Sequence, residues 1–147
     1  MTIAFFAGKY RFLSNFYDAE TEFEGVVYPT TEHAFQAAKS LLPGDREVVR
    51  AAATPAEAKR LGRKVKLRPD WEEVKYEVML TCLRSKFKRG DLRARLVATW
   101  KEPLEEGNTW GDRVWGVVHG VGQNLLGKAL MQVRSEIVAE AEARQKT

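Results

Sequence analysis

One short segment, residues 30–39, carries a carboxylate, an amide and an amine at helical spacing. Seven residues make nearly two turns of an α-helix, so Glu32, Gln36 and Lys39 fall on one face beside small alanines. Such a face is typical of a pocket wall that binds a polar substrate and transfers a proton. The alternative is a solvated face with a weak Glu–Lys contact. His33, in the same segment, is interpreted as a structural or surface histidine.

A second segment, residues 106–116, combines two tryptophans, one aspartate and three glycines. Trp110 and Trp115 flank Asp112, and flat aromatic faces stack on nucleobases. A carboxylate near apolar rings has a raised pKa, which suits proton transfer. The alternative is a glycine-rich turn whose tryptophans fill the core.

A third segment, residues 120–128, contains the spacing G-x-x-x-x-G-K of a phosphate-binding loop. Ala129 stands where that loop needs Ser or Thr, and Leu125 stands where a dinucleotide fingerprint needs glycine. Both nucleotide-binding readings are therefore rejected. What remains is a helix start at Gly122 and Asn124 whose free N–H groups face an anion, or a tight turn capped by Asn124.

A weaker candidate is the aromatic segment 12–17, in which Asn15 lies between aromatic residues including Phe16. Asn15 is expected either to hydrogen-bond a base or sugar or to brace a loop. Cys82 falls on an apolar helical stripe, which predicts a buried and inert thiol.

The elements that position these segments are predicted from hydrophobic periodicity and capping residues. Thr30 or Thr31 is expected to cap the first helix, and Thr54 the helix at residues 55–62. Extended segments are expected at residues 3–6, 22–28 (with a turn at Gly25) and 114–118. Helices are expected at residues 32–42, 45–53, 55–62 and 71–88, then from Asp91 and from Asn124. The prediction is a mainly helical α+β fold with a few short strands. We expect a single domain over residues 1–147, with a frayed tail after about residue 141.

The composition of the chain limits the classes of protein to which it could belong. The 147 residues are 44% hydrophobic and 30% charged, enough for a core in a soluble protein. No apolar run approaches the roughly 20 residues of a membrane span, the first residues do not resemble a secretory signal, and a single cysteine suits a reducing compartment. We therefore expect a cytoplasmic protein. Two histidines and one cysteine disfavour a zinc site.

The charge is mildly basic, with a net value of +4. The basic residues gather in two runs, at 59–68 and 84–89. Such runs favour anionic partners weakly, and a solvated surface is the alternative.

Four blocks in register resemble the NADAR, or YbiA-like, family: FLSNF (12–16), YPTTEHAFQAAK (28–39), GDRVWG (111–116) and GQNLLGKALM (122–131). The likeness spans roughly residues 3–137. It implies a compact, mainly helical α+β fold. It also implies hydrolysis of N-glycosidic bonds between a phosphorylated ribose and an amino group on a pyrimidine or guanine. The substrate is then either a ribosylamino-pyrimidine phosphate of riboflavin synthesis or ADP-ribose linked to guanine in nucleic acid.

Cleavage of such a bond passes through an oxocarbenium-like state, which needs a carboxylate, a proton donor and a water or amine. Within the matching blocks we assign Glu32 and Asp112 to water activation or charge stabilisation. Lys39 donates a proton or attacks the sugar carbon. We expect these three side chains to meet around one cavity. Substrate binding is assigned to Asn15, Phe16, Gln36, Trp110, Trp115, Gly122 and Asn124. No metal or cofactor is required.

Two other classes of protein compete with the enzyme. One is a non-catalytic module that binds ADP-ribose or a modified base. The other is a small nucleic-acid-binding protein that uses residues 59–68, whose affinity would fall steeply with salt. The sequence leaves the physiological substrate and the oligomeric state open.

Overall fold

A tight turn at Glu24 and Gly25 folds the second extended segment back on itself. Both residues have positive φ angles, 48° and 82°, as a type I′ hairpin turn requires. The turn joins β1 (Thr21–Phe23) to β2 (Val26–Tyr28), and the two strands pair antiparallel with Thr21 opposite Tyr28. The predicted extended segment and its turn at Gly25 are confirmed.

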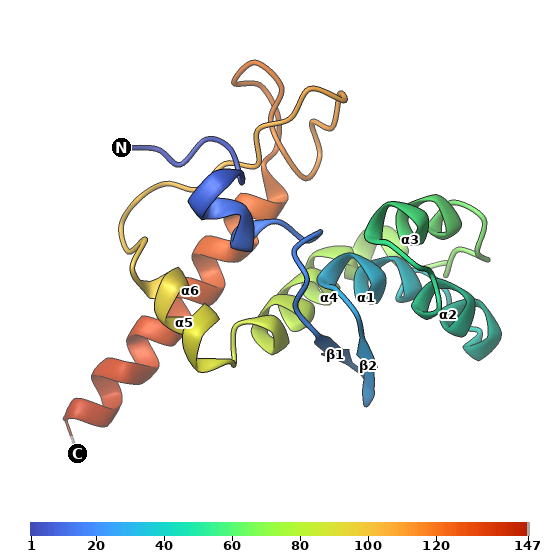
Figure 1. Ribbon diagram of the computed structural model, residues 1–147, viewed down its shortest axis with the longest axis horizontal. Helices are drawn as coiled ribbons and strands as arrows, with labels where there is room; N and C mark the ends of the chain where they lie inside the picture. The colour runs from blue at the N-terminus through green and yellow to red at the C-terminus, as the bar shows by residue number, and fades with distance from the viewer. Residues whose placement is uncertain (147) are drawn as a thin grey trace. The chain divides into compact units, whose positions relative to one another are not determined.

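The structure is a computed structural model that describes residues 1–146 (Figure 1). The chain forms two compact units. We call residues 15–86 the central unit and residues 1–14 with 87–146 the terminal unit. No helix within residues 1–146 is long and apolar enough to cross a membrane.

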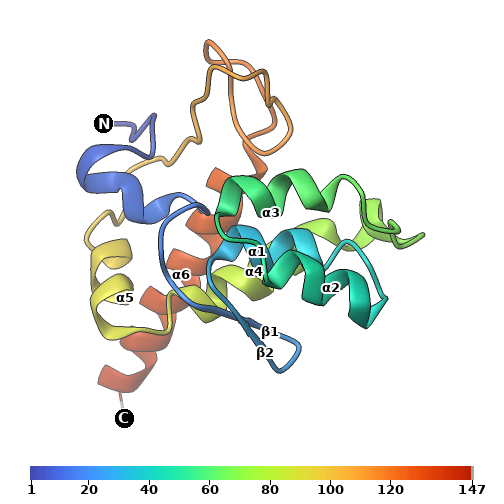
Figure 2. The same cartoon turned by 45° about the vertical axis from the view of Figure 1, so that its right-hand side comes forward.

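The helices of the central unit surround one short helix. That helix is α1 (Thr31–Ala37), and it contacts α2 (Pro43–Arg50), α3 (Pro55–Gly62) and α4 (Trp71–Lys86). Figure 2 shows α1 between α3 and α4. Every residue of α1 is buried, so its polar side chains must find partners inside the protein.

Two of these helices start at threonines, as predicted. Thr30 Oγ1 accepts a hydrogen bond from the His33 N–H (3.1 Å), and Thr54 Oγ1 accepts one from the Glu57 N–H (3.1 Å). These are N-caps, which satisfy donors that the helix leaves unpaired.

The terminal unit contains the 3-10 helix η1 (Gly8–Leu13), α5 (Gly90–Val97) and α6 (Leu125–Gln145). α5 contacts α6, and a long loop connects the two helices. Arg134 of α6 is buried and holds the start of this loop, because its Nη1 donates to Thr99 O and Glu102 O, each over 2.9 Å.

The prediction of a mainly helical α+β fold is confirmed. The predicted helix 32–42 is too long, because α1 ends at Ala37 and Pro43 begins α2 instead of ending a helix. Leu42, which precedes the proline, is extended, as residues before proline usually are. In addition, Ser40 Oγ accepts the Leu42 N–H (3.1 Å) and thereby replaces a helical bond.

One further prediction needs correction in the terminal unit. Residues 114–118 form no strand, and Val117 and Val118 take part only in isolated bridges, to Gly107 and Val121. The last helix, expected from Asn124, runs from Leu125 to Gln145.

Candidate active site

The helix α1 places Glu32 and Gln36 in the interior of the central unit. Their exposed fractions are 7% and 4%. Gln36 Nε2 donates to Glu32 Oε1 over 2.8 Å, which is the i,i+4 contact that their spacing predicts. The structure thus brings together a buried carboxylate and the amide that orients it.

The position of the Gln36 side chain depends on the close approach of α3 to α1. A Cβ atom added to Gly62 would lie 2.0 Å from Gln36 Oε1 and 2.8 Å from Gln36 Cδ. Only glycine leaves room for the amide at this point of the α1–α3 contact. Gly62 therefore supports the hydrogen bond between Gln36 and Glu32, whereas from the sequence this glycine was expected only to end a helix.

Asn15 lies beside Glu32 in the same unit. The Glu32 N–H donates to Asn15 O over 3.1 Å, and Asn15 Nδ2 donates to Met79 Sδ of α4 over 3.6 Å. Asn15 is 8% exposed, and its Oδ1 has no hydrogen-bond partner among residues 1–146. A buried acceptor without a donor is costly, so this oxygen suits a donor on a ligand.

Cys82 of α4 is buried, as predicted. Burial raises the pKa of its thiol, and the charge of Glu32 raises it further. The thiol is therefore an inert neighbour of the carboxylate.

Lys39 lies in the turn after α1 and not on the helix itself. Its N–H donates to Gln36 O over 3.2 Å. Burial lowers the pKa of its ammonium group, and the positive charges of Arg63 and Lys59 lower it further, while Glu32 opposes the shift. A lysine with a lowered pKa gives up its proton more readily than a surface lysine.

His33 is structural, as the sequence analysis favoured. Its Nε2 donates to Ala52 O over 3.0 Å, and its Nδ1 lies 2.8 Å from Thr30 Oγ1. Because the Ala52 carbonyl can only accept, the Nε2–H tautomer is assigned and Nδ1 accepts from Thr30.

Lys86, at the end of α4, is a buried amine that sequence reasoning missed. Its side chain is fully buried, and its Nζ lies 5.8 Å from the centre of the Tyr17 ring. Burial lowers its pKa to about 7. One signal was available: Lys86 follows Cys82 by four residues and so continues the apolar stripe of the helix.

Asp112 belongs to the terminal unit, where the backbone of the long loop holds it. Its Oδ1 accepts the N–H groups of Val114 (3.0 Å) and Trp115 (2.9 Å). Asn108 fixes the same turn, because its Nδ2 donates to Asp112 O and its Oδ1 accepts the Asp112 N–H. The meeting of Asp112 with Glu32 and Lys39 stays a prediction.

The start of α6 is already hydrogen-bonded to this loop. The N–H groups of Asn124, Leu125 and Leu126 donate to Gly116 O, Val114 O and Trp115 O. The Asn124 side chain donates to Leu104 O and accepts from the Glu106 N–H. A phosphate bound by Gly122 and Asn124 stays a prediction, and it would have to replace these bonds.

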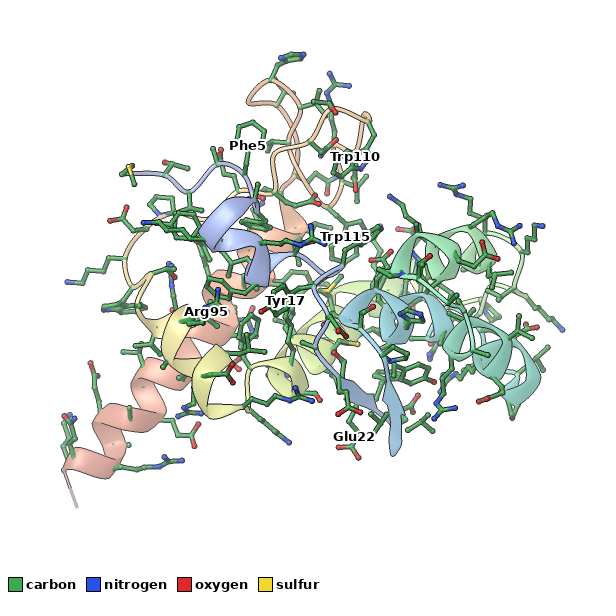
Figure 3. The ribbon with its side chains drawn as sticks, in the orientation of Figure 1. Phe5, Tyr17, Glu22, Arg95, Trp110 and Trp115 are labelled. Carbon is green, nitrogen blue, oxygen red and sulfur yellow. The ribbon has the colours of Figure 1, made fainter. Side chains whose placement is uncertain are left out.

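Three aromatic residues remain as predicted substrate contacts. Trp110 is 62% exposed, whereas Trp115 and Phe16 are partly buried. Figure 3 shows Trp110 and Trp115 at separate places on the loop. Trp110 therefore does not fill the core, which was the alternative role considered for it.

Within residues 1–146, no group of three His, Cys, Asp or Glu side chains is placed to hold a metal ion. The candidate catalytic and binding groups described in the central unit are the Glu32 carboxylate, the side-chain amides of Asn15 and Gln36, and the lysine amines.

Comparison with known proteins places the chain in a family. The NADAR domain model matches residues 4–138. N-glycosidase YbiA of Escherichia coli is 42% identical over 131 residues, covering 86% of this chain and 81% of the relative. An N-glycosidase of Nostoc punctiforme is 38% identical and covers 93% of both chains. A riboflavin biosynthesis protein of Vibrio vulnificus is 37% identical over 88% of this chain and 36% of its own length.

The NMR structure of E. coli YbiA superposes with a TM-score of 0.83 at 39% identity, covering 96% of this chain and 89% of that one. The chain has the fold of a known class of small α+β proteins. It belongs to the NADAR family, as the four sequence blocks predicted.

The buried amine of Lys86 predicts a pH-dependent stability. Its pKa is about 7 in the folded protein and 10.5 in an exposed lysine. At pH values between these two pKa values, the unfolded chain binds more protons at this lysine than the folded protein does. Raising the pH in this range therefore increases the free energy of unfolding by about 1.4 kcal/mol per pH unit. Relative to the Lys86→Met variant, the free energy of unfolding should therefore rise between about pH 7.5 and 9.5. Urea unfolding measures both profiles, and parallel profiles would show that the buried amine keeps its proton.

Proposed function

We propose that this protein is an N-glycosidase. It hydrolyses the bond between a phosphorylated ribose and an amino group on a pyrimidine or guanine base. The observation that carries the proposal is the buried Glu32, oriented by Gln36 and accompanied by the lowered pKa of Lys39. The N-glycosidases among the relatives support the same reaction.

The chemistry follows from the charge that develops at the anomeric carbon. As the bond to the base nitrogen breaks, positive charge grows on the ribose. A buried carboxylate such as Glu32 stabilises that charge more strongly than an exposed one. Lys39 donates a proton to the departing amine, and a carboxylate takes a proton from the attacking water. Asp112 of the terminal unit is the second carboxylate assigned to this work.

Base recognition is assigned first to Asn15. Its buried Oδ1 lacks a partner among the described residues, and an exocyclic amino group of a pyrimidine or guanine is a matching donor. The other proposed substrate contacts are Phe16, Gln36, Trp110, Trp115, Gly122 and Asn124.

Two substrates fit this chemistry: a ribosylamino-pyrimidine phosphate and guanine that carries ADP-ribose in nucleic acid. The riboflavin biosynthesis relative supports the first. The competing function is a module that binds ADP-ribose or a modified base without cleaving it. A buried carboxylate beside an amine with a lowered pKa favours catalysis over simple binding.

Direct assay separates these functions. We expect the purified protein to release free sugar phosphate from the ribosylamino-pyrimidine phosphate or from an oligonucleotide with ADP-ribosylated guanine. Mass spectrometry follows the release, and the unmodified oligonucleotide is the control. Tight binding of product without any release would favour the binding module.

Catalytic roles are tested by variants of the two carboxylates that keep shape and remove charge, and by two variants of Lys39. We expect Glu32→Gln, Asp112→Asn and Lys39→Ala each to lower kcat by about 10²–10⁴-fold. Asp112→Asn retains an oxygen that accepts the Val114 and Trp115 N–H groups, so its loop should remain folded. Lys39→Arg keeps a charge but holds its proton too tightly to donate it, and it should also lose activity. If a variant hydrolyses the substrate at the original rate, the substituted residue has no catalytic role.

Substitution of Gly62 tests whether activity depends on the orientation that Gln36 gives to the Glu32 carboxylate. In Gly62→Ala the new methyl group displaces the Gln36 amide, and we expect a loss of about tenfold to a hundredfold in kcat/KM. Gly44→Ala is the matched control, because no atom lies within 4 Å of its added Cβ. In a Gln36→Ala background the same Gly62→Ala change should have little further effect. An equal loss in both backgrounds would mean that Gly62 acts otherwise than through Gln36.

A further inference from the structure

The side chain of Asn108 binds both polar groups of the Asp112 backbone. Its Nδ2 donates to Asp112 O over 2.8 Å, and its Oδ1 accepts the Asp112 N–H over 3.0 Å. Two residues on neighbouring antiparallel strands exchange the same pair of hydrogen bonds. The Asn108 amide therefore takes the place of a strand partner, and it holds the backbone on both sides of the Asp112 Cα atom.

Asn108 is itself held at the base of the long loop. It is 5% exposed. Its N–H donates to Val117 O over 2.9 Å, and its Nδ2 also donates to Val117 O over 3.3 Å. The Val117 N–H in turn donates to Glu106 O over 2.9 Å. A Cβ atom added to Gly116 would lie 2.7 Å from Asn108 Nδ2, so the Gly116 backbone encloses the amide on that side.

The held backbone leaves the Asp112 carboxylate with one unused oxygen. Its Oδ1 accepts the N–H groups of Val114 and Trp115. Its Oδ2 accepts no hydrogen bond from any of residues 1–146, and Asp112 is only partly buried. Oδ2 is therefore the oxygen that is available to a substrate or a water molecule, and its direction follows from the Asp112 backbone.

We propose that Asn108 is a positioning residue for the reaction, which holds Asp112 so that Oδ2 acts on the attacking water or on the charge of the ribose. This inference rests on the proposed N-glycosidase function, in which Asp112 is the second carboxylate. Asn108 needs no contact with the substrate, because both polar atoms of its buried amide are bound to the backbone of the loop. A displacement of about 1 Å in a catalytic group can lower the rate about 10²-fold.

The kinetics of Asn108→Ala test this role. We expect kcat to fall about tenfold to a hundredfold and KM to change by less than about threefold, because Asp112 acts in the transition state. A loop that had only loosened would also displace Trp110 and Trp115, the proposed base contacts, and would raise KM. Thr109→Ala is the matched control and should keep both constants. Thr109 is exposed, and its side chain forms no hydrogen bond with the residues that the structure describes.

Coupling between the two residues gives a stricter test. In an Asp112→Asn background, Asn108→Ala should lower kcat by less than about twofold, since the carboxylate that Asn108 positions is already absent. An equal loss of kcat in both backgrounds would overturn the proposal. A rise in KM without a fall in kcat would overturn it as well.

A second variant, Asn108→Asp, applies even if Asn108→Ala does not fold. The new carboxylate repels the Asp112 carbonyl oxygen, whereas its protonated form donates a hydrogen bond in place of Nδ2. Its kcat relative to the native protein should therefore rise as the pH falls from about 8 to about 5, and the same ratio for Asn108→Ala should not. A flat ratio for Asn108→Asp would contradict the proposal.

Hydrogen exchange separates this proposal from the proposed function. In Asn108→Ala, NMR should show the Val114 and Trp115 amides exchanging at least about tenfold faster than in the native protein, with no change in Thr109→Ala. If exchange behaves in this way but no substrate is hydrolysed, the N-glycosidase proposal fails, and Asn108 still positions the Asp112 carboxylate. If hydrolysis proceeds and Asn108→Ala changes neither kcat nor exchange, the positioning role fails alone.

Discussion

The central unit is organised around the burial of one carboxylate. A charged group taken out of water costs several kcal/mol unless polar partners surround it. For Glu32 these partners include the Gln36 amide and the nearby charge of Lys39. Gln36 in turn fits only because Gly62 has no side chain. The close approach of α3 to α1 thus holds in place the amide that orients the carboxylate.

The two units hold their carboxylates in different ways. Glu32 is oriented by a side chain on its own helix and by a glycine from another helix, so its position depends on tertiary packing. Asp112 is oriented by N–H groups two and three residues further along the chain, and by Asn108. Its position is therefore a local property of one loop. Changes in helix packing should disturb the first carboxylate more than the second.

The difference between local and tertiary positioning explains which features the sequence predicted correctly. Helical spacing predicted the Glu32–Gln36 pair, and the threonine caps predicted where α1 and α3 begin, because both depend on neighbours within four residues. The end of α1 was missed, since Ser40 and Pro43 compete with the helix there. The buried Lys86 was read as part of a basic surface run, because tertiary packing alone decides that it lies inside.

The surroundings of Lys39 decide how firmly its amine holds a proton. Burial lowers the affinity of its amine for a proton, and the charges of Arg63 and Lys59 lower it further. Glu32 raises that affinity, so the carboxylate on α1 and the amine that follows the helix are electrostatically coupled. A half-buried lysine beside two other cations is costly, and the role of proton donor in the proposed reaction gives that arrangement a chemical purpose.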